Sequence, residues 1–293
     1  MSESSPSADA LAVRAAELLA SASIEVAPSE HADLRAVGEA LPADSCVYVA
    51  APAHRPLAET LDTVAAVRRA GLDPVPHVVA RRFASRTALR DFLAAAVGEH
   101  GAHRVMLIGG DVAQPAGPYA DAVQLLEDGA LARCGLREVG LAGYPEGHPR
   151  IPAGALAAAM ARKLALAREQ SLGAYVVTQF SFSPLRVTAY CAELARRAPS
   201  TPLYVGLAGP TDPLALMRYA QRCGVSASLR AMRTLGSGMV GLATHTDPQD
   251  QLMALAHHCQ IADGGNVTGI HLYGFGGALR TARWLRDRLH RAD

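Results

Sequence analysis

The chain lacks an excess of charge of either sign and a long apolar run, and each absence excludes a class of protein. Lys and Arg number 28 against 27 Asp and Glu, so no broad basic surface selects nucleic acid or an anionic membrane. No apolar run approaches the roughly 20 residues that a helix needs to cross a bilayer. We therefore expect a small molecule as partner, with no nucleic acid and no membrane.

Closely spaced cysteines are also missing. The five cysteines form no C-x-x-C pair, which excludes the usual zinc spacing and gives no disulfide framework. They are Cys46, Cys134, Cys191, Cys223 and Cys259. The Ser-rich, acidic residues 1–10 have no cationic segment typical of export. These features predict free thiols in a cytoplasmic protein without a metal site.

Hydrophobic residues make up 50% of the chain, enough for a sizeable core. Short apolar, β-branched runs alternate with longer Ala/Leu/Arg-rich stretches of helical period, as in repeated βα units around a parallel sheet. The predicted strands lie near residues 23–27, 46–51, 73–79, 104–108, 138–142, 174–179, 203–207 and 267–273. The predicted helices include residues 10–19, 56–70, 87–99, 120–133, 153–171, 184–197, 248–261 and 280–291.

This alternation predicts an α/β fold, a (β/α)8 TIM barrel, as a single domain over residues 21–293. Residues 1–20 form an N-terminal tail and helix in this interpretation. A doubly wound open sheet is the alternative, although the G-x-G-x-x-G expected after its first strand is absent. The least regular stretch, residues 230–247, is expected to extend the region between the seventh and eighth strands.

The segment 142–149 is the most informative loop. It holds the phenol of Tyr144, the carboxylate of Glu146 and the imidazole of His148 between two prolines, directly after an apolar run. We interpret this loop as part of a site. The alternative is a proline-stiffened turn whose Tyr and His side chains only pack.

Other polar residues follow predicted strands, where a barrel of this kind carries its working groups. Glu25 lies in an apolar strand, where an ionised carboxylate is costly to bury, so its pKa should be raised and suit a general acid. A structural ion pair with an arginine is the alternative. His77, after a proline, is either part of the site or a hydrogen-bonded strand-end histidine.

Two further strand ends carry similar ambiguity. Asp111 follows two glycines that permit close approach of a ligand, but it could instead cap the next helix. Gln179 ends a buried strand, and either a heterocyclic ligand or a local backbone contact would satisfy its amide.

Several short motifs occur together in the order and approximate spacing of the methylenetetrahydrofolate reductase family, which the chain resembles from about Ser23 to Phe275. They are Ser23-Ile24-Glu25, Pro76-His77, Gly110-Asp111, Tyr144-Pro145-Glu146-Gly147-His148-Pro149, Gly173-Ala174, Thr178-Gln179-Phe180 and Ile270-His271-Leu272-Tyr273. The Y-P-E-x-H-P loop and the T-Q-F strand end are the most specific of them.

The resemblance implies an enzyme, a methylenetetrahydrofolate reductase that passes a hydride from NADH or NADPH through bound FAD. Its product from 5,10-methylenetetrahydrofolate would be 5-methyltetrahydrofolate. By position, Glu25 and Asp111 are catalytic; the flavin contacts His77, Asp111, Tyr144, His148 and Arg168; and the folate contacts Gln179 and Phe180. The implied partners are a folate and a nicotinamide cofactor, with a homo-oligomer as a further possibility.

Departures from the family pattern keep two other functions open. Glu169 lies where the family places basic residues, and its carboxylate would repel the diphosphate of FAD unless Arg162 or Lys163 takes that role. A flavin-free methylenetetrahydrofolate reductase is one alternative. A folate-binding one-carbon-transfer protein of the same fold is the other.

Overall fold

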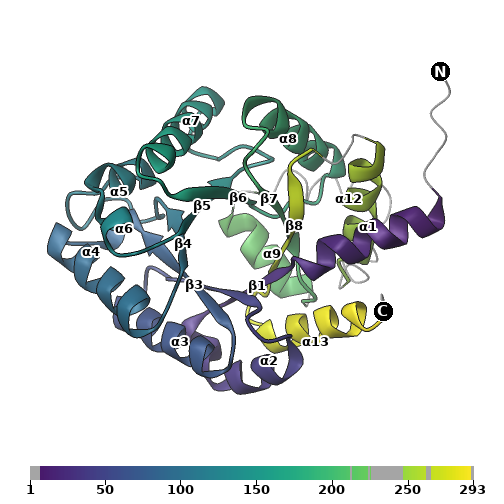
Figure 1. Cartoon of the computed structure of the whole chain (residues 1–293), viewed down its shortest axis with the longest axis horizontal. Helices are drawn as coiled ribbons and strands as arrows, with labels where there is room; N and C mark the ends of the chain where they lie inside the picture. The colour runs from purple at the N-terminus through teal and green to yellow at the C-terminus, as the bar shows by residue number, and fades with distance from the viewer. Residues whose placement is uncertain (1–6, 212, 224, 226–246, 262–264, 292–293) are drawn as a thin grey trace. The chain divides into compact units, whose positions relative to one another are not determined.

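Eight parallel strands close into a barrel in sequence order, which confirms the predicted (β/α)8 fold (Figure 1). The computed structural model describes residues 7–211, 213–223, 225, 247–261 and 265–291. The irregular stretch predicted at residues 230–247 therefore lies outside the described residues except for Asp247. Within the described ranges, no helix has both the length and the apolar character needed to cross a membrane.

The strands match the predicted apolar runs. They are β1 (Ser23–Val26), β2 (Cys46–Val49), β3 (Asp73–Val79), β4 (Arg104–Ile108), β5 (Glu138–Gly143), β6 (Gly173–Thr178), β7 (Leu203–Ala208) and β8 (Val267–Tyr273). All seven residues of β3 are buried, as expected for a strand covered on both faces by the barrel interior and the outer helices. Gly140 leaves room for the side chains of Met106 and Tyr175. A Cβ at this position would lie 2.8 Å from Met106 Sδ and 3.0 Å from the Tyr175 ring.

Side-chain caps mark the start of two helices in unit 2. Ser85 accepts a hydrogen bond from Ala88 N–H before α4, and Asp121 accepts from Val123 and Gln124 before α5. The α-helices are α1 (Ala8–Ala20), α2 (Leu34–Ala40), α3 (Leu57–Arg69), α4 (Arg86–Leu93), α5 (Ala122–Asp128), α6 (Ala130–Arg133), α7 (Ala153–Glu169), α8 (Pro184–Arg197), α9 (Pro213–Arg222), α12 (Gln249–Ile261) and α13 (Ala278–Leu289). Shorter or wider helical turns are η1 (Pro28–Asp33), η2 (Ala80–Arg82) and η3 (Ala94–Glu99).

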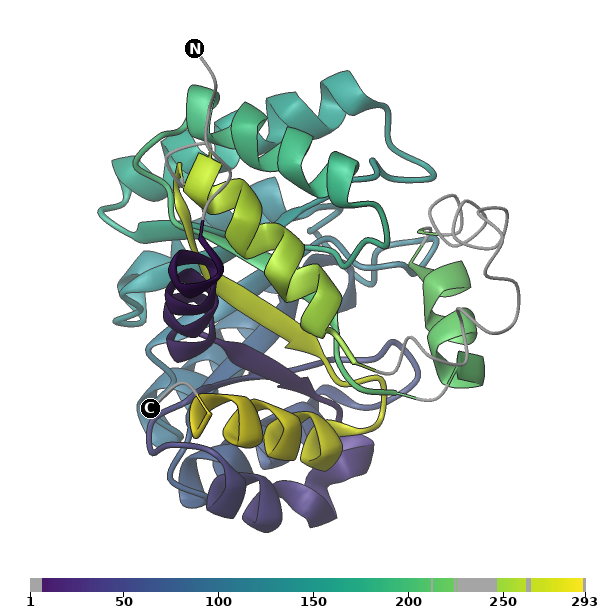
Figure 2. The same ribbon diagram turned by 90° about the vertical axis from the view of Figure 1, so that its right-hand side faces the viewer.

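The chain divides into two compact units. Unit 1 comprises residues 1–24, 143–149 and 177–293, and unit 2 comprises residues 25–142 and 150–176. In unit 1, α1 packs beside α12 and β8 (Figure 2). Arg14 donates to Val267 O at 2.9 Å, which fastens α1 to the start of β8.

The single tryptophan of the chain also lies in unit 1. Trp284 on α13 donates its indole N–H to Asp247 Oδ1 at 2.8 Å. Arg288, one turn further along α13, reaches the other oxygen of Asp247 at 2.7 Å, and its guanidinium lies 5.4 Å from the centre of the indole ring. Asp247 is thereby bound to the C-terminal helix by two side chains.

In unit 2, a charged network joins the first residues of neighbouring strands. Asp73, which opens β3, pairs with Arg68 at 2.6 Å and with Arg104 at 3.8 Å. Arg104 opens β4 and reaches Glu138, the first residue of β5, at 3.3 Å. Residues at this end of the strands serve stability in barrels, since the chemistry is carried at the opposite end.

Candidate active site

Glu25 and His77 form an acid pair in unit 2. Strand β1 supplies Glu25 and β3 supplies His77, and their Oε2 and Nε2 atoms lie 3.4 Å apart. The Glu25 side chain is 24% exposed, and among the described residues it has no ion pair with an arginine. The structural Arg–Glu pair left open by the sequence is therefore not what holds this carboxyl.

Near neutral pH the pair holds one proton, and that proton is on Glu25. Burial raises the pKa of Glu25 to about 8, and the nearby charge of Glu30 adds to the shift. Burial alone lowers the pKa of His77 to about 4. At pH 7 the pair is therefore a protonated carboxyl beside a neutral imidazole, which agrees with the raised pKa expected for Glu25.

Glu30 owes its position to the turn that follows β1. Pro28 opens η1 with its fixed φ, and the Glu30 side chain reaches back to accept a hydrogen bond from Ala27 N–H at 2.9 Å. Glu30 is 8% exposed, so its charge acts on Glu25 through little water. The sequence analysis missed Glu30, although Pro28 followed two residues later by a glutamate is a signal for such a helix start.

One tyrosine packs against His77 and is itself hydrogen-bonded to a second. Tyr48 of β2 presents its ring edge-on to His77, with centroids 6.3 Å apart. Its hydroxyl donates to that of Tyr175 on β6 at 3.1 Å, and burial raises the pKa of both phenols. Tyr48, Tyr175 and His77 are all buried, and the burial of His77 disfavours its protonated form. The sequence analysis missed this pair as well.

Consecutive arginines at the end of β3 fix the two adjacent loops. Arg81 donates to the carbonyls of Val112, Ala113 and Ala120, which hold the loop after β4. Arg82 donates to the carbonyls of Ala51 and Arg55, which hold the loop after β2. Neither guanidinium forms an ion pair among the described residues, and the hydrogen bonds of each go to neutral backbone carbonyls.

Asp111 lies on the loop that Arg81 holds. It is exposed, and its charge partly offsets the lowering of the Arg82 pKa by burial. The helix that follows is capped by Asp121 and not by Asp111, so the capping alternative for Asp111 does not hold. Gly110 has φ +99°, and a Cβ there would meet Val79 at 2.7 Å, which explains the glycine before Asp111.

The loop 143–149 belongs to unit 1. Gly147 N–H donates to Tyr144 O at 3.0 Å, which closes a turn led by Pro145. The rings of Tyr144 and His148 meet edge-on with centroids 5.4 Å apart. Burial raises the pKa of Tyr144, and Cys223 adds to the shift. The structure thus brings this phenol and imidazole together, and their predicted role toward a ligand stays a prediction.

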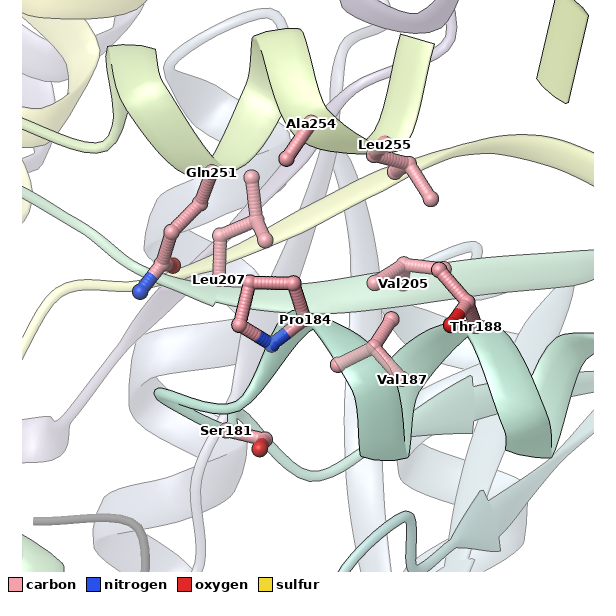
Figure 3. A pocket seen from close by; sticks show the side chains of 9 residues that line it. All are labelled: Ser181, Pro184, Val187, Thr188, Val205, Leu207, Gln251, Ala254 and Leu255. Carbon is pink, nitrogen blue, oxygen red and sulfur yellow. The ribbon is translucent and has the colours of Figure 1, made fainter. Parts of the chain in front are cut away.

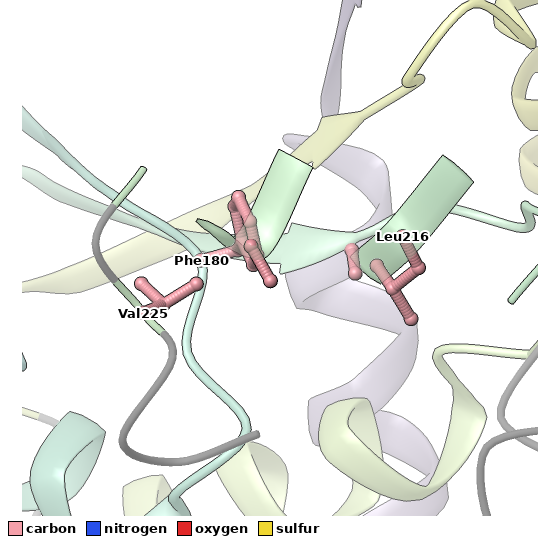
Figure 4. Close-up of a cluster of buried hydrophobic side chains, with 5 residues drawn as sticks. Phe180, Leu216 and Val225 are labelled. Atoms are coloured by element: carbon pink, nitrogen blue, oxygen red, sulfur yellow. The ribbon is translucent and has the colours of Figure 1, made fainter. Parts of the chain in front are cut away.

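Gln179 and Phe180 follow β6, also in unit 1. The Gln179 side-chain oxygen accepts from Phe180 N–H at 3.1 Å, the local contact that the sequence left open. Phe180 is fully buried in a cluster with Ala208, Leu216, Ala220 and Val225 (Figure 4). Phe180, predicted as a folate contact, therefore serves as core packing.

The three helix residues considered for a diphosphate lie on α7 in unit 2. Arg168 is exposed, and Glu169 is paired with Arg162 at 3.6 Å. Lys163 is 8% exposed, and burial lowers its pKa to about 8, an effect that Asp121 partly offsets. Arg162 also reaches Glu127 at 3.4 Å, so it offsets only part of the negative charge of Glu169.

The described residues contain no cluster of three His, Cys, Asp or Glu side chains that could hold a metal ion. A small apolar crevice of about 20 Å³ lies between α8, α12 and β7 in unit 1 (Figure 3). It is lined by Ser181, Pro184, Val187, Thr188, Val205, Leu207, Gln251, Ala254 and Leu255. It has room for about one water molecule and is too small for a folate.

The sequence matches no known protein-family profile. Among solved structures, it is similar to dihydropteroate synthase from Thermus thermophilus in complex with 6HMPPP, at 16% identity, 92% coverage of each chain and a TM-score of 0.47. Dihydropteroate synthase from Xanthomonas albilineans with 4-aminobenzoic acid gives 16% identity, 92% coverage of each chain and a TM-score of 0.46. At TM-scores below 0.5 this likeness carries no argument for synthase activity in this chain.

These neighbours nevertheless correct the sequence analysis. They are dihydropteroate synthases, so the predicted methylenetetrahydrofolate reductase family, its reductase activity and its oxidoreductase chemistry with FAD and NAD(P)H are contradicted. The motifs behind that prediction are short strand ends. Polar residues recur there in many unrelated barrels, because that end of the fold carries the chemistry.

Proposed function

We propose that the chain binds a reduced folate and acts in one-carbon transfer without a flavin, with Glu25 as the proton donor. The observation that carries this proposal is the acid pair: a carboxyl with a pKa of about 8 beside an imidazole with a pKa of about 4. A general acid works best when its pKa lies near the working pH. Glu25 meets that requirement and His77 does not compete for its proton.

The charges around Glu25 suit a ligand that becomes cationic. In a bound 5,10-methylenetetrahydrofolate, the Glu25 proton would move to N10 while the N10–carbon bond breaks and its electron pair stays on N10. The N5 lone pair then forms a cationic iminium with the methylene carbon. The carboxylate left on Glu25 is disfavoured by burial and by Glu30 while the site is empty, but it would stabilise that cation.

His77 and Tyr48 support this role without reacting. A neutral His77 3.4 Å from Glu25 restrains the carboxyl, and the edge of Tyr48 keeps the imidazole in apolar surroundings. The free thiols of all five cysteines accord with a reducing compartment, and we place the protein in the cytoplasm. Gln179 remains a predicted folate contact.

Isotope exchange tests this function without knowledge of the one-carbon acceptor. Ring opening followed by addition of water releases formaldehyde reversibly, so the protein should speed exchange of ¹³C-formaldehyde into methylenetetrahydrofolate, followed by NMR. We expect Glu25→Gln to slow that exchange by roughly 10²-fold or more, the range of general acid catalysis. Calorimetry should show tetrahydrofolate binding nearly unchanged, since glutamine keeps the size and a hydrogen-bond donor.

Three results would overturn the proposal. The first is an absence of tetrahydrofolate binding, and the second is an exchange rate that Glu25→Gln leaves unchanged. The third is consumption of NADH or NADPH with methylenetetrahydrofolate in the absence of flavin, which would replace transfer by reduction.

A further inference from the structure

The last helix of the chain, α13, carries a concentration of positive charge that the chain as a whole lacks. Residues 278–293 hold five arginines and two aspartates, whereas the whole sequence has 28 Lys and Arg against 27 Asp and Glu. The rest of the sequence is therefore slightly acidic. Helix α13, drawn in yellow in Figure 2, lies at the surface of unit 1, so this charge faces solvent.

One side of α13 is fixed against the core. Its buried positions follow the helical period and have at most 2% exposure; they are Ala278, Thr281, Ala282 and Leu285. The contacts of Trp284 and Arg288 with Asp247 hold the flank of the helix. The opposite side therefore faces solvent in one fixed orientation.

The solvent-facing side presents a row of arginines. Exposed positions of α13 and of the turn after it recur every three or four residues, as on one side of a helix; they are Arg280, Arg283, Asp287, His290 and Arg291. Arg286 contacts Asp287 at 2.9 Å and offsets its charge. Within the described ranges, Arg280, Arg283 and Arg291 form no ion pair, and we call these three the arginine stripe. At 1.5 Å per residue the stripe is roughly 17 Å long.

The stability of α13 gives no reason for this pattern. Arg280 lies in the first turn, which has no acidic residue, and its guanidinium folds back so far that a Cβ on Gly277 would lie 2.8 Å from Nη2. A positive charge at this end opposes the helix dipole. Arg280 and Arg283 are three residues apart, so they also repel one another. An anion bound along the stripe would relieve both effects.

A short acidic polypeptide segment suits the stripe better than nucleic acid or a membrane. A duplex or a bilayer presents phosphates well beyond the length of the stripe, over a molecule that is otherwise slightly acidic. A helix that binds a bilayer turns its apolar side to the lipid, whereas the apolar side of α13 is buried. Single-stranded nucleic acid needs aromatic rings for its bases, and the indole of Trp284 is held by Asp247 and Arg288.

We propose that the arginine stripe binds an acidic segment of a partner polypeptide, whose carboxylates pair with Arg280, Arg283 and Arg291. Guanidinium groups suit carboxylates because both are planar and can form two parallel hydrogen bonds. Exposed pairs are individually weak, so the complex is readily reversible and sensitive to salt. This interaction is separate from the chemistry proposed for Glu25 and does not depend on it.

Fluorescence anisotropy of a labelled oligoglutamate peptide, about 12 residues long to cover the stripe, tests the interaction. We expect the double variant Arg280→Gln with Arg283→Gln to weaken binding about tenfold, because it removes two exposed charge pairs. Raising the salt from ~50 to ~500 mM should weaken binding by the unaltered chain as well. The double variant should resist urea at least as well as the unaltered chain, because it removes the repulsion within α13.

The matched control is Arg69→Gln with Arg90→Gln. Both are exposed arginines of unit 2 without an ion pair among the described residues, so the control loses the same charge elsewhere. It should leave the affinity for the peptide unchanged. Isotope exchange into methylenetetrahydrofolate should proceed in the arginine-stripe variant as in the unaltered chain, which separates a failure of this proposal from a failure of the proposed function.

Four results would overturn the proposal. The unaltered chain does not bind the peptide at ~50 mM salt, or the arginine-stripe variant and the control bind it equally well. The arginine-stripe variant loses resistance to urea, which would show that these arginines serve the fold. An RNA oligonucleotide or a vesicle rich in phosphatidylserine binds more tightly than the peptide at equal ionic strength, which would replace the polypeptide by another polyanion.

Discussion

Glu25 and His77 each hold a protonation state that water would not give them. The same burial acts on both in opposite senses, because it disfavours whichever form is charged. The carboxyl keeps its proton and the imidazole remains without one. Near neutral pH, Glu25 can therefore donate a proton and His77 cannot. The same two pKa shifts make the stability of the fold depend on pH.

The stability of the protein should fall between pH 6.5 and 8. In that interval folded Glu25 is still protonated and unfolded Glu25 is ionised, so the folded state binds more protons and rising pH favours unfolding. The loss should be up to roughly 2 kcal/mol over this range, at about 1.4 kcal/mol per pH unit. Urea unfolding followed by circular dichroism measures it, and Glu25→Gln should remove this slope.

His77 sets the lower limit of that window. Between about pH 4 and 6.5 unfolded His77 binds a proton that folded His77 does not, so rising pH favours folding and opposes the Glu25 effect. The two slopes should nearly cancel from about pH 4.5 to 6.5. In His77→Gln the decline should therefore start near pH 4.5. A decline that starts at the same pH in both proteins would contradict the assignment to this pair.

At the scale of elements, the strands and their closure into a barrel were predictable from the sequence, and the short helices were not. Every predicted strand begins within one residue of the observed one, because a buried parallel strand reads as a continuous apolar run. The turn and helix η1–α2 and the helix α9 were missed. Pro28 and the short length of α2 hide the helical period there, since two turns are too few to show it.

The site residues were predicted one by one, but the contacts between them were not. Glu25 and His77 stood out singly as polar residues in apolar strands, but their pairing joins β1 to β3, and sequence spacing does not encode such a contact. Glu30 escaped notice because its role depends on a backbone turn. The Glu30 charge acts on Glu25 only through the hydrogen bond that folds the Glu30 side chain back.

The end of β3 should control two loops independently. Arg82→Gln removes a charged donor from the carbonyls of Ala51 and Arg55, so hydrogen exchange should quicken in residues 50–56. Arg81→Gln should quicken it in residues 109–120 instead. Each variant is the control for the other, with an expected loss of about 1.5–3 kcal/mol for hydrogen bonds from a charged group. Equal exchange in both loops of either variant would contradict separate control.

At the scale of the whole molecule, one end of the barrel strands contributes to stability and the other carries the proposed chemistry. The starts of β3, β4 and β5 hold the Asp73–Arg104–Glu138 network, while the proposed chemistry belongs to residues near strand ends. Arg104→Met leaves Glu138 without its cation, while Asp73 keeps Arg68 at 2.6 Å. Because Glu138 is 42% exposed and Asp73 stays paired, we expect the free energy of unfolding to fall by roughly 1–2 kcal/mol, less than for a fully buried pair.

The control for Arg104 is a surface pair. Arg35 contacts Glu39 at 3.1 Å but is 92% exposed, so Arg35→Met should change stability by less than about 1 kcal/mol. Both variants should bind tetrahydrofolate as the unaltered chain does. Equal losses of stability in the two variants, measured by urea unfolding, would show that the network contributes no more than a solvated pair.

The contact between Trp284 and Asp247 gives the molecule an intrinsic spectroscopic reporter. Because Trp284 is the single tryptophan, emission excited at its wavelength arises from α13 alone and follows the unfolding of unit 1. Circular dichroism follows the helices of both units together. Superimposable transitions by the two signals would mark the barrel as one cooperative folding unit, and an earlier change in emission would mark unit 1 as the part that opens first.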